Sequence, residues 1–140
     1  MTLTFANASE AREISRMANE IWHESFKGII SLGQINYMLI QYQTERKILE
    51  QMDAGYQYGF VFEGKNKAGY FAIVPEEDSL FMSKLYLKKE YRGRGLGAAT
   101  LKDIADIGRN LGKRRVYLHV NRNNAKAIKA YESSGFTLEC

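Results

Sequence analysis

The residues of this 140-residue chain whose types and spacing best suit a chemical task form the stretch YRGRGLGAATLKDI, Tyr91 to Ile104. Three glycines and two arginines stand within Arg92 to Gly97, and a helical pattern follows at once. Glycine permits positive φ angles and close approach of a ligand to the backbone, and a helix start presents unpaired N–H groups at the positive end of its dipole. Arginine adds charge-assisted hydrogen bonds to phosphate oxygens. The stretch predicts a phosphate or pyrophosphate site; a purely structural strand-to-helix turn is the alternative.

Two common classes of phosphate-binding loop do not fit this stretch. A Walker loop requires Gly-Lys-Ser/Thr, where this chain has Leu96-Gly97-Ala98. A Rossmann loop should lie in an early βαβ unit, with an acidic residue about 20 positions further on to bind the ribose. Here the glycines begin near residue 92, and the strand after the next helix ends in Val120-Asn121. The Walker reading therefore fails on residue type, and the Rossmann reading fails on the position of the loop and on the missing acidic residue.

A third class matches at two places in the chain. The run Arg92-Gly93-Arg94-Gly95-Leu96-Gly97 resembles the Arg/Gln-x-x-Gly-x-Gly/Ala loop of the GCN5-related N-acetyltransferases, the GNAT superfamily. The segment NRNNAKAIKAYESSGF, Asn121 to Phe136, resembles the second signature of that family. The two motifs stand in the expected order, separated by one helix and one strand. The resemblance covers roughly residues 60–136, and the N-terminal helices share only the general layout.

The resemblance implies acetyl-CoA as cosubstrate and assigns residues to it. The loop amides and the helix N-terminus would hold the pyrophosphate, which places Arg92, Gly93, Arg94, Gly95, Leu96 and Gly97 in the cofactor site. Main-chain groups of the preceding strand, at Leu85, Tyr86 and Leu87, would contact the pantetheine arm and the acetyl carbonyl. Asn124 would contact the cofactor, and Tyr131, seven residues further on, would lie near its sulfur.

Two side chains are candidates for proton transfer. A phenol near the sulfur can protonate or stabilise the leaving thiolate, so Tyr131 is the candidate general acid; packing on the sheet is its alternative role. The acceptor ammonium must lose a proton, and His119 lies on the polar face of its strand, where amine-acetylating relatives often carry a glutamate. Its ordinary pKa near 6.5 suits a base, although a lone histidine is more often structural than catalytic. The acidic turn Glu76 to Asp78 offers rival bases, or a lip that attracts a cationic amine.

The hydrophobic periodicity predicts the elements that must position these residues. Helical spacing follows caps near Asn7 and Ser9, at Ser31 and at Thr44, and two-residue alternation indicates strands. The expected helices cover about 9–25, 31–43, 44–54, 96–111 and 125–133, and the expected strands 56–63, 68–74, 80–87, 115–120 and a last one from Phe136. Hairpins give antiparallel pairs and a strand-helix-strand unit gives a parallel pair. We therefore expect an α+β fold with a mixed, mostly antiparallel sheet flanked by helices, the three-layer α/β/α sandwich of the GNAT fold.

Composition supports one ordinary domain over residues 1–140. The chain is 45% hydrophobic and 26% charged, with a net charge of +4 and a pI of about 9.1. One cysteine, Cys140, excludes an internal disulfide, and with two histidines it predicts no metal site. The N-terminus lacks the basic and apolar regions of a signal peptide, and the longest apolar run, Tyr70 to Val74, is too short to span a bilayer. We expect a cytoplasmic protein without a membrane partner.

The sequence therefore predicts an N-acetyltransferase that passes acetyl from acetyl-CoA to a primary amine, of a small molecule or a peptide, in a ternary complex. A non-catalytic acyl-CoA-binding module is the alternative. The basic residues Lys88, Lys89, Arg92, Arg94 and Lys113 to Arg115 also permit nucleic-acid binding, which their place beside the glycine loop makes the weaker hypothesis. Family members continue further beyond the Gly-Phe, so we expect either a truncated chain or a sheet edge covered by another subunit. Residues 28–44 should select the acceptor, and the acidic turn favours a cationic one.

Overall fold

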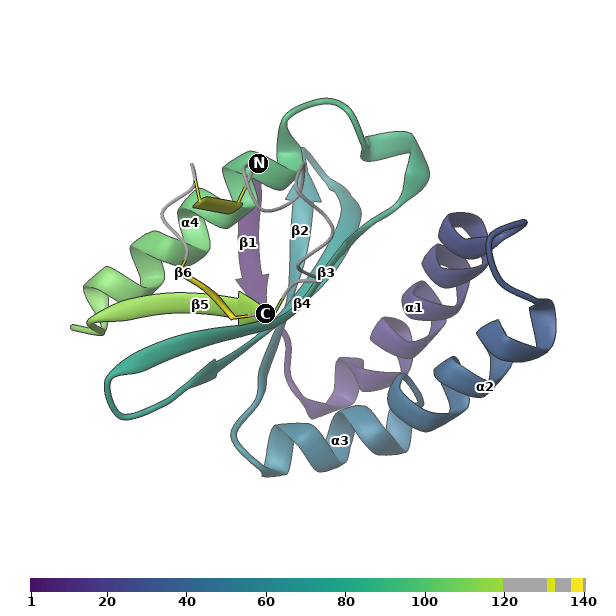
Figure 1. The fold of residues 1–140 in the computed structure, drawn as a ribbon, viewed down its shortest axis with the longest axis horizontal. Coiled ribbons are helices and arrows are strands. Elements are labelled where there is room, and N and C mark those ends of the chain that lie inside the picture. The colour runs from purple at the N-terminus through teal and green to yellow at the C-terminus, as the bar shows by residue number, and fades with distance from the viewer. Residues whose placement is uncertain (120–130, 133–136, 140) are drawn as a thin grey trace.

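The computed structural model describes residues 1–119, 131–132 and 137–139, and it contains a sheet with helices on both faces (Figure 1). The strands are β1 (Thr2–Phe5), β2 (Gln57–Glu63), β3 (Asn66–Pro75), β4 (Ser79–Leu87), β5 (Arg115–His119) and β6 (Thr137–Glu139). The helices are α1 (Ala11–Phe26), α2 (Leu32–Tyr42), α3 (Glu45–Asp53) and α4 (Leu96–Asn110), with short 3-10 turns η1 (Ala8–Glu10) and η2 (Lys89–Tyr91).

The sheet is mixed and mostly antiparallel, as predicted. Its six described strands follow the order β1-β2-β3-β4-β5-β6. The pairs from β1 to β4 are antiparallel, whereas β4–β5 and β5–β6 are parallel. The parallel pair β4–β5 is the one joined by α4, because a crossover helix must separate parallel neighbours. The glycine loop is the first part of that crossover.

Side-chain caps set the helix starts close to where the sequence places them. Ser31 accepts a hydrogen bond from the N–H of Gln34 at 3.1 Å, and Thr44 accepts one from Lys47 at 3.1 Å. Asn7 forms a capping box with Glu10, but this box begins the turn η1 rather than α1 itself. These caps satisfy N–H groups that have no partner within the helix.

Some predicted boundaries are wrong. The strand β1 was not predicted, because four residues with mostly exposed side chains carry too little periodicity to reveal a strand. The second strand of the hairpin begins at Asn66 rather than at residue 68, which leaves a turn of Gly64 and Lys65. Leu111, at the expected end of the helix 96–111, lies one residue beyond α4 and is 52% exposed. The predicted helix 125–133 falls mainly outside the described residues, and Tyr131 and Glu132 are helical.

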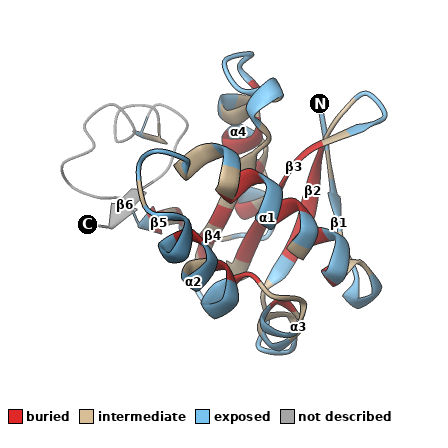
Figure 2. Ribbon diagram, turned by 90° about the vertical axis from the view of Figure 1, so that its right-hand side faces the viewer, coloured by how far each residue is buried: buried red, intermediate tan, exposed pale blue. Residues whose placement is uncertain are grey.

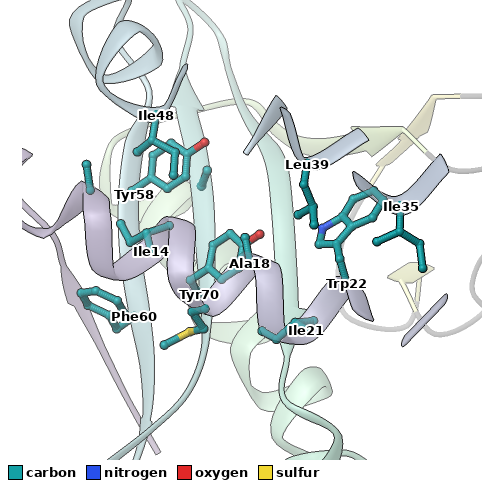
Figure 3. Close-up of a cluster of buried hydrophobic side chains, with 13 residues drawn as sticks. Ile14, Ala18, Ile21, Trp22, Ile35, Leu39, Ile48, Tyr58, Phe60 and Tyr70 are labelled. Atoms are coloured by element: carbon teal, nitrogen blue, oxygen red, sulfur yellow. The ribbon is translucent and has the colours of Figure 1, made fainter. Parts of the chain in front are cut away.

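Two apolar cores hold the layers together, as the burial pattern in Figure 2 shows. On one face of the sheet, α1, α2 and α3 cover Tyr58, Phe60 and Tyr70, whose rings pack among aliphatic side chains of the helices (Figure 3). On the other face, α4 covers a cluster that includes Phe71 and Leu80. The predicted three layers are therefore present.

A β-bulge at Ser83 changes which side chains of β4 face which helices. Ile73 of β3 pairs with Met82, and the adjacent Ala72 pairs with Lys84, so Ser83 is the extra residue. Met82 belongs to the α4 side of the sheet, and normal alternation would place Lys84 there too. The bulge instead turns Lys84 toward the side of α1–α3, where it bonds residues of α3 and β2.

Candidate functional site

The glycine loop lies between β4 and α4, as its sequence predicts. Gly93 and Gly95 have φ angles of +75° and +79°, a region that side chains disfavour, and a Cβ atom at either position would meet no atom within 4 Å. Packing therefore does not explain these glycines. Their backbone conformation, with open space beside it, is what a loop that receives a ligand needs.

The start of α4 offers main-chain donors to that open space. The N–H of Ala99 bonds the carbonyl of Gly95 at 3.0 Å, which is the first hydrogen bond of the helix. The N–H groups of residues 96–98 precede it and have no partner within the helix. The helix is 15 residues long and its dipole is positive at this end. An anion such as a pyrophosphate fits these donors.

The two arginines of the loop have different surroundings. Arg92 donates through Nε to the carbonyl of Leu87 at 3.0 Å and through Nη2 to the hydroxyl of Ser25, so it fastens the loop to β4 and α1. Arg94 lies over the ring of Tyr91 at 5.7 Å and makes no hydrogen bond or ion pair with the described part of the chain. Of the two, Arg94 is the one whose guanidinium is available to a phosphate.

Beside the loop, β4 and β5 part from each other. Their parallel pairing runs from Ser79–Arg115 to Phe81–Tyr117. Between the described residues, no pairing continues from Ser83–Leu87 to the end of β5. The bulge at Ser83 lies at the start of this separation, where bulges characteristically bend a strand. Among the described residues, β4 therefore has no strand partner on this side from Ser83 to Leu87, and we call this side, next to the predicted phosphate site, the opening.

Main-chain groups of β4 face this opening. The N–H of Lys88 bonds the carbonyl of Ala68 on β3 at 2.8 Å. Because successive N–H groups of a strand point in opposite directions, those of Leu85 and Leu87 point away from β3. The side chains of these two leucines pack against the α4 cluster, while that of Tyr86 packs against the opposite core. The predicted main-chain contacts of Leu85 and Leu87 are thus geometrically available, whereas the N–H of Tyr86 points to β3.

The candidate acid, Tyr131, and the candidate base, His119, both belong to the C-terminal part of the chain, after α4. Tyr131 is partly buried and packs against the α4-side cluster. The pKa of Tyr86 is raised, first by burial and second by the charge of Tyr131. His119 is exposed and makes edge contacts with the rings of Phe81 and Tyr117, at 5.2 and 6.0 Å. It lies on the predicted polar face of β5, near its carboxyl end. Asn124 lies outside the described residues.

The acidic turn Glu76 to Asp78 lies at the end of β4 that is remote from the glycine loop. It precedes β4, and six residues of strand separate Ser79 from Leu85, which is roughly 20 Å. Glu76 accepts a hydrogen bond from the hydroxyl of Tyr117 at 2.8 Å, and Lys113 donates to the carbonyl of Glu76. The structure therefore places this turn at the opposite end of β4 from the glycine loop.

The basic residues do not form one patch. Arg94 precedes α4 and Lys113 to Arg115 follow it, and a helix of that length spans about 22 Å. Lys88 lies 3.7 Å from Glu20, and the backbone N–H of Lys89 bonds Glu24 at 3.2 Å. The sequence cluster is thus divided between two ends of a helix and partly neutralised by α1.

One charged residue was missed by the sequence reading. Lys84 is only 9% exposed, and its ammonium donates to Gln51 Oε1 at 3.0 Å and to the hydroxyl of Tyr58. The hydroxyl of Tyr58 in turn donates to the same Gln51 oxygen. Across the sheet, Ala72 lies between Lys84 and Tyr58, and its small side chain leaves room for the lysine stem. In the sequence, alternation alone would have assigned Lys84 to the other face.

The free energy of unfolding is expected to depend on pH through the protonation of Lys84. Burial lowers the pKa of Lys84 to about 8 from 10.5. Between these values the unfolded chain binds a proton that the folded chain does not, so stability rises with pH, by at most about 3 kcal/mol. Above about pH 10 the slope reverses, because burial raises the pKa of Tyr58 and the unfolded chain then loses a proton that the folded chain keeps. Denaturant unfolding at a series of pH values measures the rise.

The variant Lys84→Met is expected to remove this rise between pH 8 and 10 and to fold at least as stably as the wild type at pH 7. Its methyl end occupies similar volume, and the Tyr58–Gln51 hydrogen bond remains. Lys102→Met, at an exposed position of α4, is the matched control and should keep the rise. A wild-type stability that stays level between pH 8 and 10 would contradict the prediction.

Within the described ranges, no helix has both the length and the apolar composition needed to cross a membrane.

Comparison with known proteins places these features in a family. The model of the acetyltransferase (GNAT) family matches residues 16–136. The probable spermine N(1)-acetyltransferase of Bacillus subtilis subsp. natto (strain BEST195) is 28% identical over 119 residues, which cover 76% of this chain and 75% of that protein. The spermine/spermidine N(1)-acetyltransferase of Bacillus subtilis (strain 168) is 27% identical over 119 residues, with the same coverage. A solved structure, the PaiA N-acetyltransferase of Thermoplasma acidophilum in complex with coenzyme A, matches with a TM-score of 0.78 at 21% identity, over 99% of this chain and 92% of that one. This last likeness is one of fold.

Proposed function

This chain belongs to the acetyltransferase (GNAT) family, and from that membership we propose that it passes the acetyl group of acetyl-CoA directly to a primary amine while both are bound. The observation that carries the proposal is the parting of β4 and β5 directly beside an open glycine loop and a helix N-terminus. A phosphate-bearing donor can lie on the loop while its reactive end extends into the opening.

In the proposed donor complex, the pyrophosphate is bound by the N–H groups of residues 96–98, with Arg94 as the charged partner. Arg92 keeps the loop in place through its hydrogen bond to Leu87. The amide-bearing arm of CoA lies along β4 in the opening, where it can pair with main-chain groups of Leu85 and Leu87 as a neighbouring strand would. A donor N–H from this strand on the acetyl oxygen would polarise the carbonyl and stabilise the negative charge that develops on it.

The proposed reaction joins the amine nitrogen to the acetyl carbon and breaks the bond between that carbon and sulfur. The electron pair of the broken bond leaves with sulfur, and Tyr131 is proposed to supply the proton that converts the thiolate to a thiol. The acceptor ammonium must first lose a proton, and His119 is proposed to accept it directly or through a water molecule. After attack the nitrogen carries one further proton, and its loss, directly or through water, would return the proton that Tyr131 gives to sulfur. Holding amine and thioester together supplies much of the rate enhancement.

The test is an acetyl-CoA turnover screen over a polyamine, an amino sugar, an amino acid and a peptide with a free N-terminus. We expect release of the CoA thiol together with an equal amount of acetylated amine for at least one class, with mass spectrometry identifying the product. Measurable acetyl-CoA binding without thiol release across the whole panel would contradict the proposal and would favour a non-catalytic acyl-CoA-binding role.

A further inference from the structure

Lys84 is a buried cation without a carboxylate to balance it. Its described partners, Gln51 and Tyr58, are both neutral, and the structure contains no ion pair of Lys84 within the described residues. The residues outside the described ranges, 120–130, 133–136 and 140, include neither aspartate nor glutamate. Buried charges in proteins are ordinarily paired, so an unbalanced one invites a functional explanation.

The side chain of Lys84 lies on one particular side of the sheet. The glycine loop leads into α4, so a donor bound there approaches the opening from the α4 side. The acceptor would then approach from the face covered by α1–α3. The side chain of Lys84 lies on this same face because of the bulge at Ser83. Tyr86 faces this side through its contact with Trp22, with ring centroids 5.8 Å apart. Lys84 directly precedes Leu85, whose N–H faces the opening.

The carboxylates of α1, α3 and the acidic turn for which contacts are described bond groups other than Lys84. Glu76 is bonded to Tyr117 at the far end of β4. On α1, Glu20 lies beside Lys88 and Glu24 accepts the N–H of Lys89. On α3, Glu50 pairs with Arg46 and Lys47. None of these described carboxylates contacts Lys84, so its charge is not balanced by direct pairing.

We propose that Lys84 is a specificity residue that disfavours acceptors with a second positive charge and favours amines whose far end is neutral or anionic. The inference rests on the proposed acetyl transfer, and it concerns the acceptor class alone. The ammonium extends across β3 toward Tyr58 and Gln51. If the far charge of a bound acceptor lies within about 10 Å of it, an effective dielectric of about 20 gives roughly a tenfold change in binding. The bulge is what makes this possible, because without it the ammonium would lie on the donor side.

Three acceptors of matched length test the proposal: 1,6-diaminohexane, 6-aminohexan-1-ol and 6-aminohexanoate. At the end away from the reacting amine, the first carries one positive charge, the second is neutral and the third carries one negative charge. At pH 7 and low salt, we expect the wild type to prefer the amino alcohol over the diamine by about tenfold in kcat/KM, and to prefer the amino acid at least as strongly as the alcohol. Lys84→Met should bring the three values to within about threefold of one another, mainly by improving the diamine.

Calorimetric binding of the same three amines to the CoA-loaded protein gives the comparison independently of turnover. Lys102→Met, exposed on α4, should retain the wild-type order in both measurements. A preference for the diamine, equal values for the three, or no binding of any of them by the wild type would overturn the inference. An unchanged order in a folded Lys84→Met would do so too. Failure of the proposed transfer is recognised separately, by the absence of thiol release with every amine of the wider panel.

Discussion

The variant Gly95→Val is expected to lose CoA binding by more than about 100-fold, which corresponds to about 2.7 kcal/mol. Gly95 holds a φ of +79° as the N-cap of α4, and a β-branched side chain disfavours that conformation strongly. The new side chain would also project into the open space beside the N–H groups of residues 96–98, where we place the pyrophosphate. Isothermal titration of CoA into the folded variant measures the loss.

Gly112 supplies a matched control for the backbone strain. It has a φ of +75°, a Cβ there would also meet no atom within 4 Å, and it lies just beyond the opposite end of α4. Gly112→Val should therefore lose a similar amount of folding stability and bind CoA as the wild type does. If Gly95→Val is folded and binds CoA with unchanged affinity, the assignment of the glycine loop to the donor is wrong.

The variant Tyr131→Phe is expected to lower kcat by about 100-fold while changing the affinity for CoA by less than about threefold. The ring keeps its packing against the α4-side cluster, so the fold and the donor site are retained. What is lost is the hydroxyl that we propose to protonate the departing sulfur. This pattern identifies a group that acts in the transition state rather than in binding. Steady-state kinetics and calorimetry on the same preparation measure both quantities.

Tyr56→Phe is the control for removal of a phenol. Tyr56 directly precedes β2, which is separated from β5 by two strands in the order of the sheet. Its kcat should equal that of the wild type. A Tyr131→Phe enzyme with full activity would show that Tyr131 only packs on the sheet, which is the role that its helical spacing permits on its own. Another group, or water, would then have to protonate the thiolate.

The starts of α2 and α3 could be predicted because each depends on a cap next to its own helix. Ser31 and Thr44 bond N–H groups three residues away, so neighbours in sequence decide the structure. The glycine loop is similar, since its positive φ angles are a local requirement that residue type reveals. The order of elements then implied a parallel β4–β5 pair, which the structure confirms.

The chemistry of individual side chains depended on contacts between distant segments. Arg92 was predicted to bind phosphate, but in the fold its guanidinium also reaches Ser25, which is 67 residues away. The acidic turn was predicted to offer rival bases or to attract a cationic amine, and in the fold Glu76 accepts a hydrogen bond from Tyr117, which is 41 residues away. Neither result could follow from spacing, because each depends on how α1, β4 and β5 are packed together.

The sequence by itself therefore determined the family, the order of most elements and the place of the glycine loop, because caps, periodicity and glycine conformation are properties of short segments. The tertiary structure alone decided where β4 separates from β5 and which face Lys84 occupies. A single extra residue at Ser83 inverts the alternation of β4, and its position follows from the pairing of β3 with β4 rather than from residue type. That inversion buries a cation on the side we assign to the acceptor.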